Sequence, residues 1–459
     1  MTIEVERGVD DAPSRWDGPR LAFWVSFVAA GPLLIWWLGW YPGFLSTDSI
    51  AQLDEIDRFD ITNRIPALHT VLVWAVTRIW DSPAAVGLLQ VGALVALGAI
   101  FAARVTRLGV PWPLSAFSVV VLSWLPAVSA TTPALEVQVA QTLVAVWLFV
   151  ELLELARVGV EGLSRPLSVR LGLALGLVWL LDHAGILVVV AVAAALAIVA
   201  RRDLRRLTTI GVAAAAVFVV TQVAVYTAFS VDREVTPLGE AYAPEIAAVL
   251  VHDRGTFEDD DLDALAAVAD LEVWESAYEC GDGERLVDDR DFDTDVVAAD
   301  PGRYRGLLAE AAFSSPGTVL GHRVCAASFL FVPGHPLGDR YETYVYNVPI
   351  NELGLARDSL WEGAFNMTKA ILVRTDQPQQ LWLFWRPGLL VWPALAAYVV
   401  LAVRRRTHLL WPGLALGAHL LVAALTVRSP SFREAFAVYA LSFLSLPLWW
   451  LAVRPSRSS

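Results

Sequence analysis

A small set of polar and ionisable side chains stands beside long apolar runs of the sequence. Charge near lipid is costly unless it is paired or hydrated, so such residues are functional candidates. Acids can take a proton from a hydroxyl group and arginines can bind phosphate, which are the two tasks of a group-transfer site. We expect the set to surround one cavity: Asp48, Gln52, Asp54, Arg64, His69, Glu136, Asp182, His183, Arg428, Arg433 and Glu434.

Asp48 is the first candidate for a catalytic base. It lies in the stretch Trp37–Gln52, after a long apolar run and the turn at Pro42 and Gly43. This spacing puts its carboxylate just beyond the end of a membrane-spanning helix. The local alternative is that Asp48 only caps a helix beginning at Ser49, because Ser, Thr and Asp are common N-caps.

The other candidates also have ordinary structural explanations. Glu136 follows Thr131 and Pro133, and a Thr cap, an early Pro and an acid in the first turn are typical of a helix start. Arg433 could anchor the chain at lipid headgroups. His183, in a tight turn between two short apolar segments, could cap that turn as readily as contact a ligand.

The composition predicts a polytopic, all-α membrane protein. Hydrophobic residues make up 56% of the chain, which has 19 Trp and a mean hydropathy of +0.54. A soluble enzyme is rarely so apolar. The first apolar run is too long for a cleaved signal peptide. We expect ten spans, at residues 21–41, 84–103, 112–130, 134–153, 170–182, 184–200, 207–229, 381–402, 408–427 and 435–453.

The arginines predict the orientation of these spans. Clusters of Arg precede span 1, follow spans 2, 4, 6 and 8, and end the chain, so with ten spans all of them fall on one side. The positive-inside rule makes that side cytoplasmic, with cytoplasmic tails at 1–20 and 454–459. The first outer loop is then 42–83, in which 67–80 is too short to span and is expected to lie at the interface. The basic clusters are short and explained by topology, so no nucleic-acid partner is expected.

Residues 230–380, inserted before the last three spans, form a second, acidic unit. They hold 29 Asp and Glu against 11 Arg and Lys, while the rest of the chain is net positive. We expect a partly helical extracytoplasmic domain, with helices near 243–252 and 261–270. Its two cysteines, Cys280 and Cys325, could form a disulfide on that side of a membrane. The acidic run 289–295 lacks the glycine and final glutamate of a calcium-binding EF-hand loop, which favours solvated surface charge.

The joint pattern resembles the GT-C superfamily of membrane glycosyltransferases, which includes protein O-mannosyltransferases and the lipid A aminoarabinose transferase. It is most similar to an uncharacterised bacterial multi-pass branch of that superfamily. The stretches that carry the resemblance are 42–52, 88–90, 182–185 and 431–433. The chain departs from the branch at three positions. Ile65 stands where a histidine is expected, Asp182 where a basic residue is expected, and Glu434 where a tyrosine is expected after the arginine.

The resemblance implies transfer of a sugar, with inversion, from a polyprenyl-phosphate carrier to an envelope glycan, lipid or protein at the outer face of the cytoplasmic membrane. Asp48 and Glu136 match the catalytic acids, with Asp48 as the base. A divalent cation, Mg²⁺ or Mn²⁺, would be held by the same two acids if one is needed. The residues expected to bind the donor and its phosphate are Gln52, Arg64, His69, His183 and Arg433.

Two other functions fit the same sequence. A transporter of lipid-linked substrates would also want charges within a bundle, but the chain shows no duplicated halves and its polar residues lie towards one face. A non-catalytic scaffold or sensor would use the acidic domain as its working part. Replacing Asp48 by Asn would leave that function intact.

Overall fold

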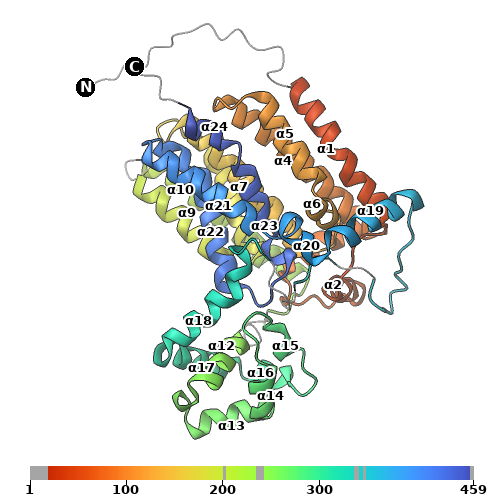
Figure 1. The fold of residues 1–459 in the computed structure, drawn as a ribbon, viewed down its shortest axis with the longest axis vertical. Helices are drawn as coiled ribbons and strands as arrows, with labels where there is room; N and C mark the ends of the chain where they lie inside the picture. The colour runs from red at the N-terminus through yellow and green to blue at the C-terminus, as the bar shows by residue number, and fades with distance from the viewer. Residues whose placement is uncertain (1–18, 200–202, 234–241, 335–340, 345–347, 455–459) are drawn as a thin grey trace.

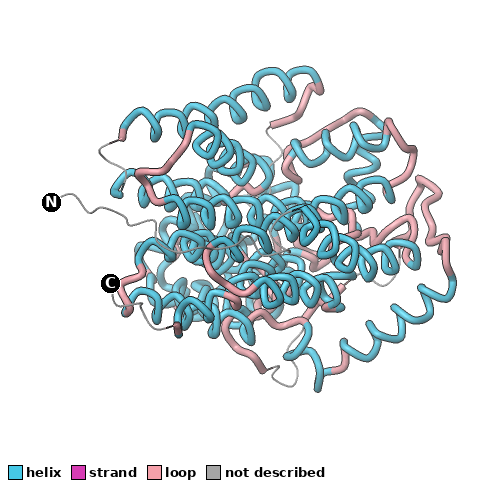
Figure 2. Tube along the Cα trace, turned by 90° about the horizontal axis from the view of Figure 1, so that it is seen from above, coloured by secondary structure: helices cyan, strands magenta, loops and turns pink. Residues whose placement is uncertain are grey.

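The computed structural model describes residues 19–199, 203–233, 242–334, 341–344 and 348–454. Most of both predicted tails, 1–20 and 454–459, lies outside these ranges. Within them the chain is helical and holds no β-strand, as Figure 2 shows. Two isolated β-bridges join Thr62 to Asp232 and Glu342 to Ser431. The predicted all-α class is therefore confirmed for the described residues.

Each of the ten predicted apolar segments lies mainly in helix, and these helices pack into one bundle (Figure 1). Several segments are broken; for example, the third is interrupted at Leu125, because the residue before Pro126 avoids the helical region. The bundle helices are α1 (Pro19–Gly39), α4 (Ala84–Arg107), α5 (Trp112–Trp124), α6 (Pro126–Thr131), α7 (Val137–Val158), α8 (Arg165–Leu181), α9 (Gly185–Val199), α10 (Leu204–Val219), η1 (Val220–Val225), α11 (Tyr226–Ala228), α20 (Pro378–Phe384), α21 (Gly388–Val403), η5 (Thr407–Leu410), α22 (Trp411–Thr426), α23 (Phe432–Ser445) and α24 (Leu448–Val453).

Five helical stretches in the described residues are long and apolar enough to cross a bilayer. The outer surface of one of them, Leu204–Ala228, exposes valines that water would not favour, such as Val212 and Val223. The apolar helices therefore suggest a membrane protein, and ten spans are not confirmed by the described residues. The five stretches are Ala84–Arg107, Val137–Val158, Leu204–Ala228, Pro378–Val403 and Thr407–Thr426.

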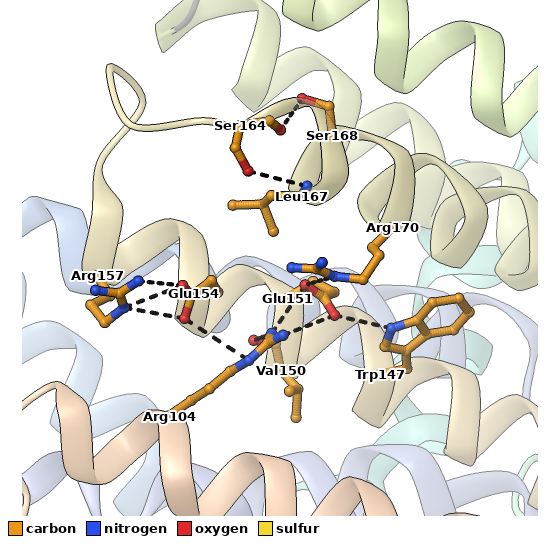
Figure 3. Close-up of polar contacts among 10 residues, drawn as sticks. All are labelled: Arg104, Trp147, Val150, Glu151, Glu154, Arg157, Ser164, Leu167, Ser168 and Arg170. Carbon is orange, nitrogen blue, oxygen red and sulfur yellow. Dashed lines mark hydrogen bonds and ion pairs between the residues drawn. The ribbon is translucent and has the colours of Figure 1, made fainter. Parts of the chain in front are cut away.

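Glu151 of α7 organises a buried ion cluster near one end of the bundle (Figure 3). Its carboxylate accepts hydrogen bonds from Arg104 of α4 at 3.1 Å, from Arg170 of α8 at 3.0 Å and from Trp147 at 3.2 Å. Every partner comes from a helix of the core, so the charge is compensated where it is buried. The cluster ties α4, α7 and α8 together.

The same end of the bundle, where α4, α7, α21 and α24 end, is called the arginine end. Here Arg206 donates to the carbonyl of Glu161 at 2.8 Å, and Arg404 donates to the carbonyl of Val453 at 2.9 Å. Arg201 and Arg202 lie outside the described residues. The described arginines of the predicted clusters, such as Arg104, Arg206 and Arg404, thus lie at one end, which is the grouping that the positive-inside interpretation requires.

The opposite end is called the domain end, because a small helical domain is attached to it (Figure 1). The domain has its own core around the fully buried Trp274, and the two cysteines form a disulfide, Cys280–Cys325, with 5.9 Å between Cα atoms. Its helices are α12 (Ala243–His252), η3 (Arg254–Thr256), α13 (Asp259–Val268), α14 (Leu271–Ala277), α15 (Glu284–Val287), α16 (Thr294–Ala299), α17 (Pro301–Ser314) and α18 (Pro316–Ala326). The following η4 (Ala327–Leu330) packs into the core of the bundle.

The domain is smaller than the predicted 230–380. Its core comes from residues between Ala243 and Val319, whereas α19 (Glu362–Thr375) packs against α1 of the bundle and buries Thr368, which accepts a hydrogen bond from Trp40 at 2.8 Å. The composition could not show this division, because acidic residues continue through both parts. Residues 234–241 and 335–340 lie outside the described ranges.

Two short helices, α2 (Thr47–Arg58) and α3 (Ala67–Thr77), lie at the domain end and make up most of the predicted first outer loop. With 11 residues, α3 is too short to cross a bilayer, as expected. Leu45, Leu53 and Ile56 anchor α2 in a separate small core with Val73 and Val86. This core fixes the start of α2 relative to the bundle.

Candidate functional site

The first turn of α2 presents Asp48 towards solvent. Ser46, and not Asp48, is the N-cap: its hydroxyl accepts from the Ser49 amide at 3.1 Å, and the Ser49 hydroxyl accepts from the Ser46 amide at 3.0 Å. The alternative in which Asp48 caps a helix beginning at Ser49 is therefore wrong. With the cap supplied by Ser46, the Asp48 carboxylate is left free for other contacts, and its side chain is 53% exposed.

Asp48, Glu136 and Arg433 meet at the domain end. The Arg433 guanidinium, in the first turn of α23, lies 3.4 Å from an oxygen of Asp48. Glu136, at the N-cap of α7, is 6% exposed and accepts a hydrogen bond of 3.4 Å from the Ser49 hydroxyl. Ser49 also donates to the carbonyl of Leu135 at 2.5 Å, which holds the starts of α2 and α7 together.

Glu136 is the buried acid of this group. Burial raises the pKa of its carboxyl to about 7, although the positive charge of Arg433 and hydrogen bonds from Ser46 and Ser49 oppose the shift. A carboxyl with this pKa can hold or release a proton near neutral pH. The exposed Asp48 and the buried Glu136 are therefore placed for different tasks.

Arg433 lies among several acids. Besides Asp48, it lies 3.9 Å from Glu284 of the small domain, and its charge also acts on Glu136 and Glu434. Burial raises the pKa of the Glu284 carboxyl, against the effect of Arg433. The group formed by Asp48, Glu136, Glu284 and Arg433 is called the acid–arginine cluster below.

Gln52, one helical turn after Asp48 on α2, pairs with His69 of α3. The Gln52 amide donates to Nδ1 of His69 at 3.0 Å and to the hydroxyl of Thr70 at 2.9 Å. Both side chains are 2% exposed, and burial lowers the pKa of His69 to about 4, so its ring is neutral at pH 7. The pair joins α2 to α3, and its contacts support a structural role in holding α2.

Arg64 and His183 meet through the backbone of Arg64. The His183 ring, in the turn between α8 and α9, is held by the backbone of Asn63 and Arg64, and the Arg64 side chain is exposed. The turn itself is capped by Asp182, whose carboxylate accepts from the Ala184 amide at 2.9 Å. The alternative in which His183 caps the turn is therefore wrong.

The comparisons with known proteins add no relative. No family model, no curated protein and no solved structure matches the chain. The site must be interpreted from its own geometry.

The cluster does not fit a divalent cation. Asp48 and Glu136 were the expected ligands, but the Arg433 guanidinium already lies against Asp48 and would repel a metal there. Among the residues that the structure describes, no three side chains of His, Cys, Asp or Glu gather as ligands. We therefore derive no step through a metal.

Three participants were missed from the sequence: Ser46, Ser49 and Glu284. The two serines stand three residues apart just before an apolar helix face, a spacing typical of a capping box, so this signal was present. Glu284 had no distinguishing signal, because it is one of 29 acids in residues 230–380. Only the docking of the domain places it beside Arg433.

Proposed function

We propose that the protein is an inverting membrane glycosyltransferase that moves a sugar from a polyprenyl-phosphate carrier to a hydroxyl of an envelope glycan, lipid or protein. The observation that carries the proposal is the meeting of Asp48, Glu136 and Arg433 from three separate helix starts. In this proposal the protein lies in the cytoplasmic membrane with its domain end on the extracytoplasmic side. The arginine end and both chain termini face the cytoplasm.

Asp48 acts as the base. A hydroxyl is a weak nucleophile, so Asp48 takes its proton while the oxygen attacks the anomeric carbon. The new glycosidic C–O bond forms as the bond between that carbon and the carrier phosphate breaks, with inversion at the carbon. The phosphate leaves with the bonding pair, and its charge is stabilised by Arg433.

The acids around Arg433 shape how it meets a phosphate. In the free protein the guanidinium is shared between Asp48 at 3.4 Å and Glu284 at 3.9 Å. A carrier phosphate would replace one of them as the partner of Arg433. Protonated Glu136 would reduce the negative charge that the phosphate meets, which is why its raised pKa suits the proposal.

The deciding experiment replaces Asp48 by Asn. Membranes containing the native chain or Asp48→Asn are given polyprenyl-phosphate sugars, and transfer to envelope acceptors is followed together with the amount of the donor that remains. We expect at least a 100-fold loss of transfer with normal protein abundance. The matched control is Asp54→Asn, on the same helix but paired only with exposed Arg58. Equal transfer by the native chain and Asp48→Asn would refute the proposal.

One observation favours a second function, that of a non-catalytic scaffold or sensor. The contact between Glu284 and Arg433 joins the small domain to the membrane bundle through the same cluster. If the cluster only fastens the domain, Glu284→Gln would loosen the domain, whereas Asp48→Asn would have no effect on any transfer. The two functions therefore differ in the result of the same Asp48 variant.

A further inference from the structure

A polar cavity of about 100 Å³ lies between α7, α8, α22 and α23, next to the acid–arginine cluster. It exceeds the roughly 15 Å³ that one ordered water needs. Glu434 follows Arg433 on α23, and Gln138 lies two residues beyond Glu136 on α7, so cavity and cluster share two helix starts. The polar side chains that line the cavity are Gln138, Gln141, Asp182, His419, Thr426 and Glu434.

Each of the two amides in the wall has one of its two N–H donors engaged within the protein. Gln138 donates from its amide nitrogen to Glu434 at 3.0 Å, and Gln141 donates to the carbonyl of Leu181 at 2.6 Å. The buried amide oxygen of Gln138 has no hydrogen-bond partner. A buried acceptor without a partner raises the free energy of the folded protein, so a donor from a ligand or from water would stabilise this atom.

His419 and Thr426 also use a hydrogen-bond donor within the protein. Nδ1 of His419 lies 2.9 Å from the carbonyl of Ala415, which can only accept, so Nδ1 carries the hydrogen and Nε2 is left as an acceptor. The hydroxyl of Thr426 donates to the carbonyl of Val422 at 2.9 Å. All four neutral side chains therefore leave hydrogen-bond acceptors for a ligand.

Two carboxylates complete the lining. Asp182 and Glu434 lie near enough for the charge of Glu434 to raise the pKa of Asp182, which burial raises first, to about 6. Asp182 is thus mainly ionised at neutral pH or above. The described lining contains no Lys or Arg; the adjacent Arg433 forms its ion pairs with Asp48 and Glu284, and its charge also acts on Glu434.

We propose that this cavity binds the primary ammonium group of a small ligand. An ammonium group supplies three donors and one positive charge to a wall that holds unused acceptors and the two carboxylates of Asp182 and Glu434. A directly bound divalent metal fits less well, because no three acid or His side chains converge among the described residues. This inference rests on the proposed function in one respect: a ligand held here lies beside the cluster, so the transferred sugar or its acceptor would carry an amine.

The test measures binding to the full-length protein in detergent by calorimetry, at constant ionic strength and pH 7.5. Glucosamine is compared with glucose and N-acetylglucosamine, which have the same ring without the charge, and ethanolamine represents a lipid headgroup. We expect glucosamine or ethanolamine to bind at least tenfold more tightly than both neutral sugars. Tighter binding of glucosamine indicates an amino sugar as the source, and tighter binding of ethanolamine a headgroup. Equal binding of charged and neutral ligands, or none, overturns the proposal.

Variants locate the site. Asp182→Asn and Glu434→Gln should each weaken binding of the charged ligand at least tenfold, while Asp54→Asn should bind it normally. Asp48→Asn should also bind it normally although transfer is lost, which separates this proposal from the proposed function. Unchanged binding in both cavity variants would show that the ligand binds elsewhere. The comparison of charged and neutral ligands uses the native chain and therefore does not depend on whether the variants fold.

Discussion

At the scale of single residues, the site depends on which side chain ends the helix. Ser46 takes the N-cap of α2 and exchanges hydrogen bonds with Ser49, so the Asp48 carboxylate can reach Arg433. An acid in the first turn is also favoured by the helix dipole, but it is not needed to satisfy the backbone. Asp48 is therefore available for chemistry because Ser46 caps the helix.

This division predicts different stability effects for the two residues. Ser46→Ala should lower the free energy of unfolding by about 1 kcal/mol, because it removes the cap. Asp48→Asn should change it by less than about 0.5 kcal/mol, because the side chain is half exposed and its ion pair is weak in water. Thermal unfolding of the purified protein in detergent measures both. A larger loss in Asp48→Asn than in Ser46→Ala would contradict the assignment of the cap.

The raised pKa of Glu136 predicts that the stability of the protein depends on pH. Its pKa rises from 4.5 to about 7 on folding, so between these values the folded state holds a proton that the unfolded chain has lost. Stability should therefore fall as the pH rises from 4.5 to 7, by at most about 3 kcal/mol from this residue. Unfolding measured across this range should show a shallower slope in Glu136→Gln. Some slope should remain, because the pKa of Asp182 is raised in the same direction. An unchanged slope would mean that Glu136 is ionised in the folded protein.

At the scale of helices, buried ion pairing at the arginine end sets the packing of α4, α7 and α8. Glu151 is 2% exposed and has Arg104, Arg170 and Trp147 as partners. Removing its charge would leave the largely buried Arg104 with the more distant Glu154, at 4.0 Å, as its acidic partner, a larger loss than that of an exposed pair. The same helices deliver Glu136 and Asp182 to the domain end.

Glu151→Gln should therefore destabilise the protein by about 3 kcal/mol or more. The matched control is Glu275→Gln, whose ion pair with Arg254 is exposed and should matter by less than about 1 kcal/mol. Thermal unfolding of both variants in one detergent gives the comparison. Similar losses in the two would show that the buried cluster contributes no more than a surface pair.

At the scale of the whole molecule, the small domain is docked on the loop that leads into α23. The Gly283 amide donates to the carbonyl of Arg428 at 2.9 Å, and Arg323, which forms an ion pair with Glu245, donates to the carbonyl of Val427 at 2.9 Å. This docking brings Glu284 to Arg433. The domain therefore helps to position the cation of the cluster.

Gly283→Val should loosen the docking, because a Cβ at this position would lie 2.8 Å from the carbonyl oxygen of Arg428 and 2.8 Å from the Pro244 ring. Gly281→Val is the matched control, since a Cβ there meets open space. Hydrogen exchange should accelerate at residues 281–287 and 427–433 in the Gly283 variant alone. If exchange at these residues is unchanged, the close approach at Gly283 does not hold the domain.

The sequence by itself determined the class of the protein. Long apolar runs that cross a bilayer satisfy their backbone hydrogen bonds as helices, and repeated arginines mark one side, so the helical bundle and the grouping of its charges follow from local patterns. The start of α12 at Ala243 was predicted for the same reason, because its apolar face repeats at helical spacing. The interruptions within the apolar segments were not predicted, since prolines such as Pro126 break helices that composition alone treats as continuous.

Only the tertiary structure decided which polar residues meet. Asp48, Glu136 and Arg433 are far apart in the chain and come together because three helix starts pack at the domain end. Gln52 and His69 pair in an interface instead, and His183 turns to Arg64, although the sequence gives all of them the same polar character beside apolar runs. The type of a side chain and its distance in sequence from a span determine how deep in the membrane it lies. Its neighbours are determined by the rotation and packing of each helix, which depend on contacts between residues distant in sequence.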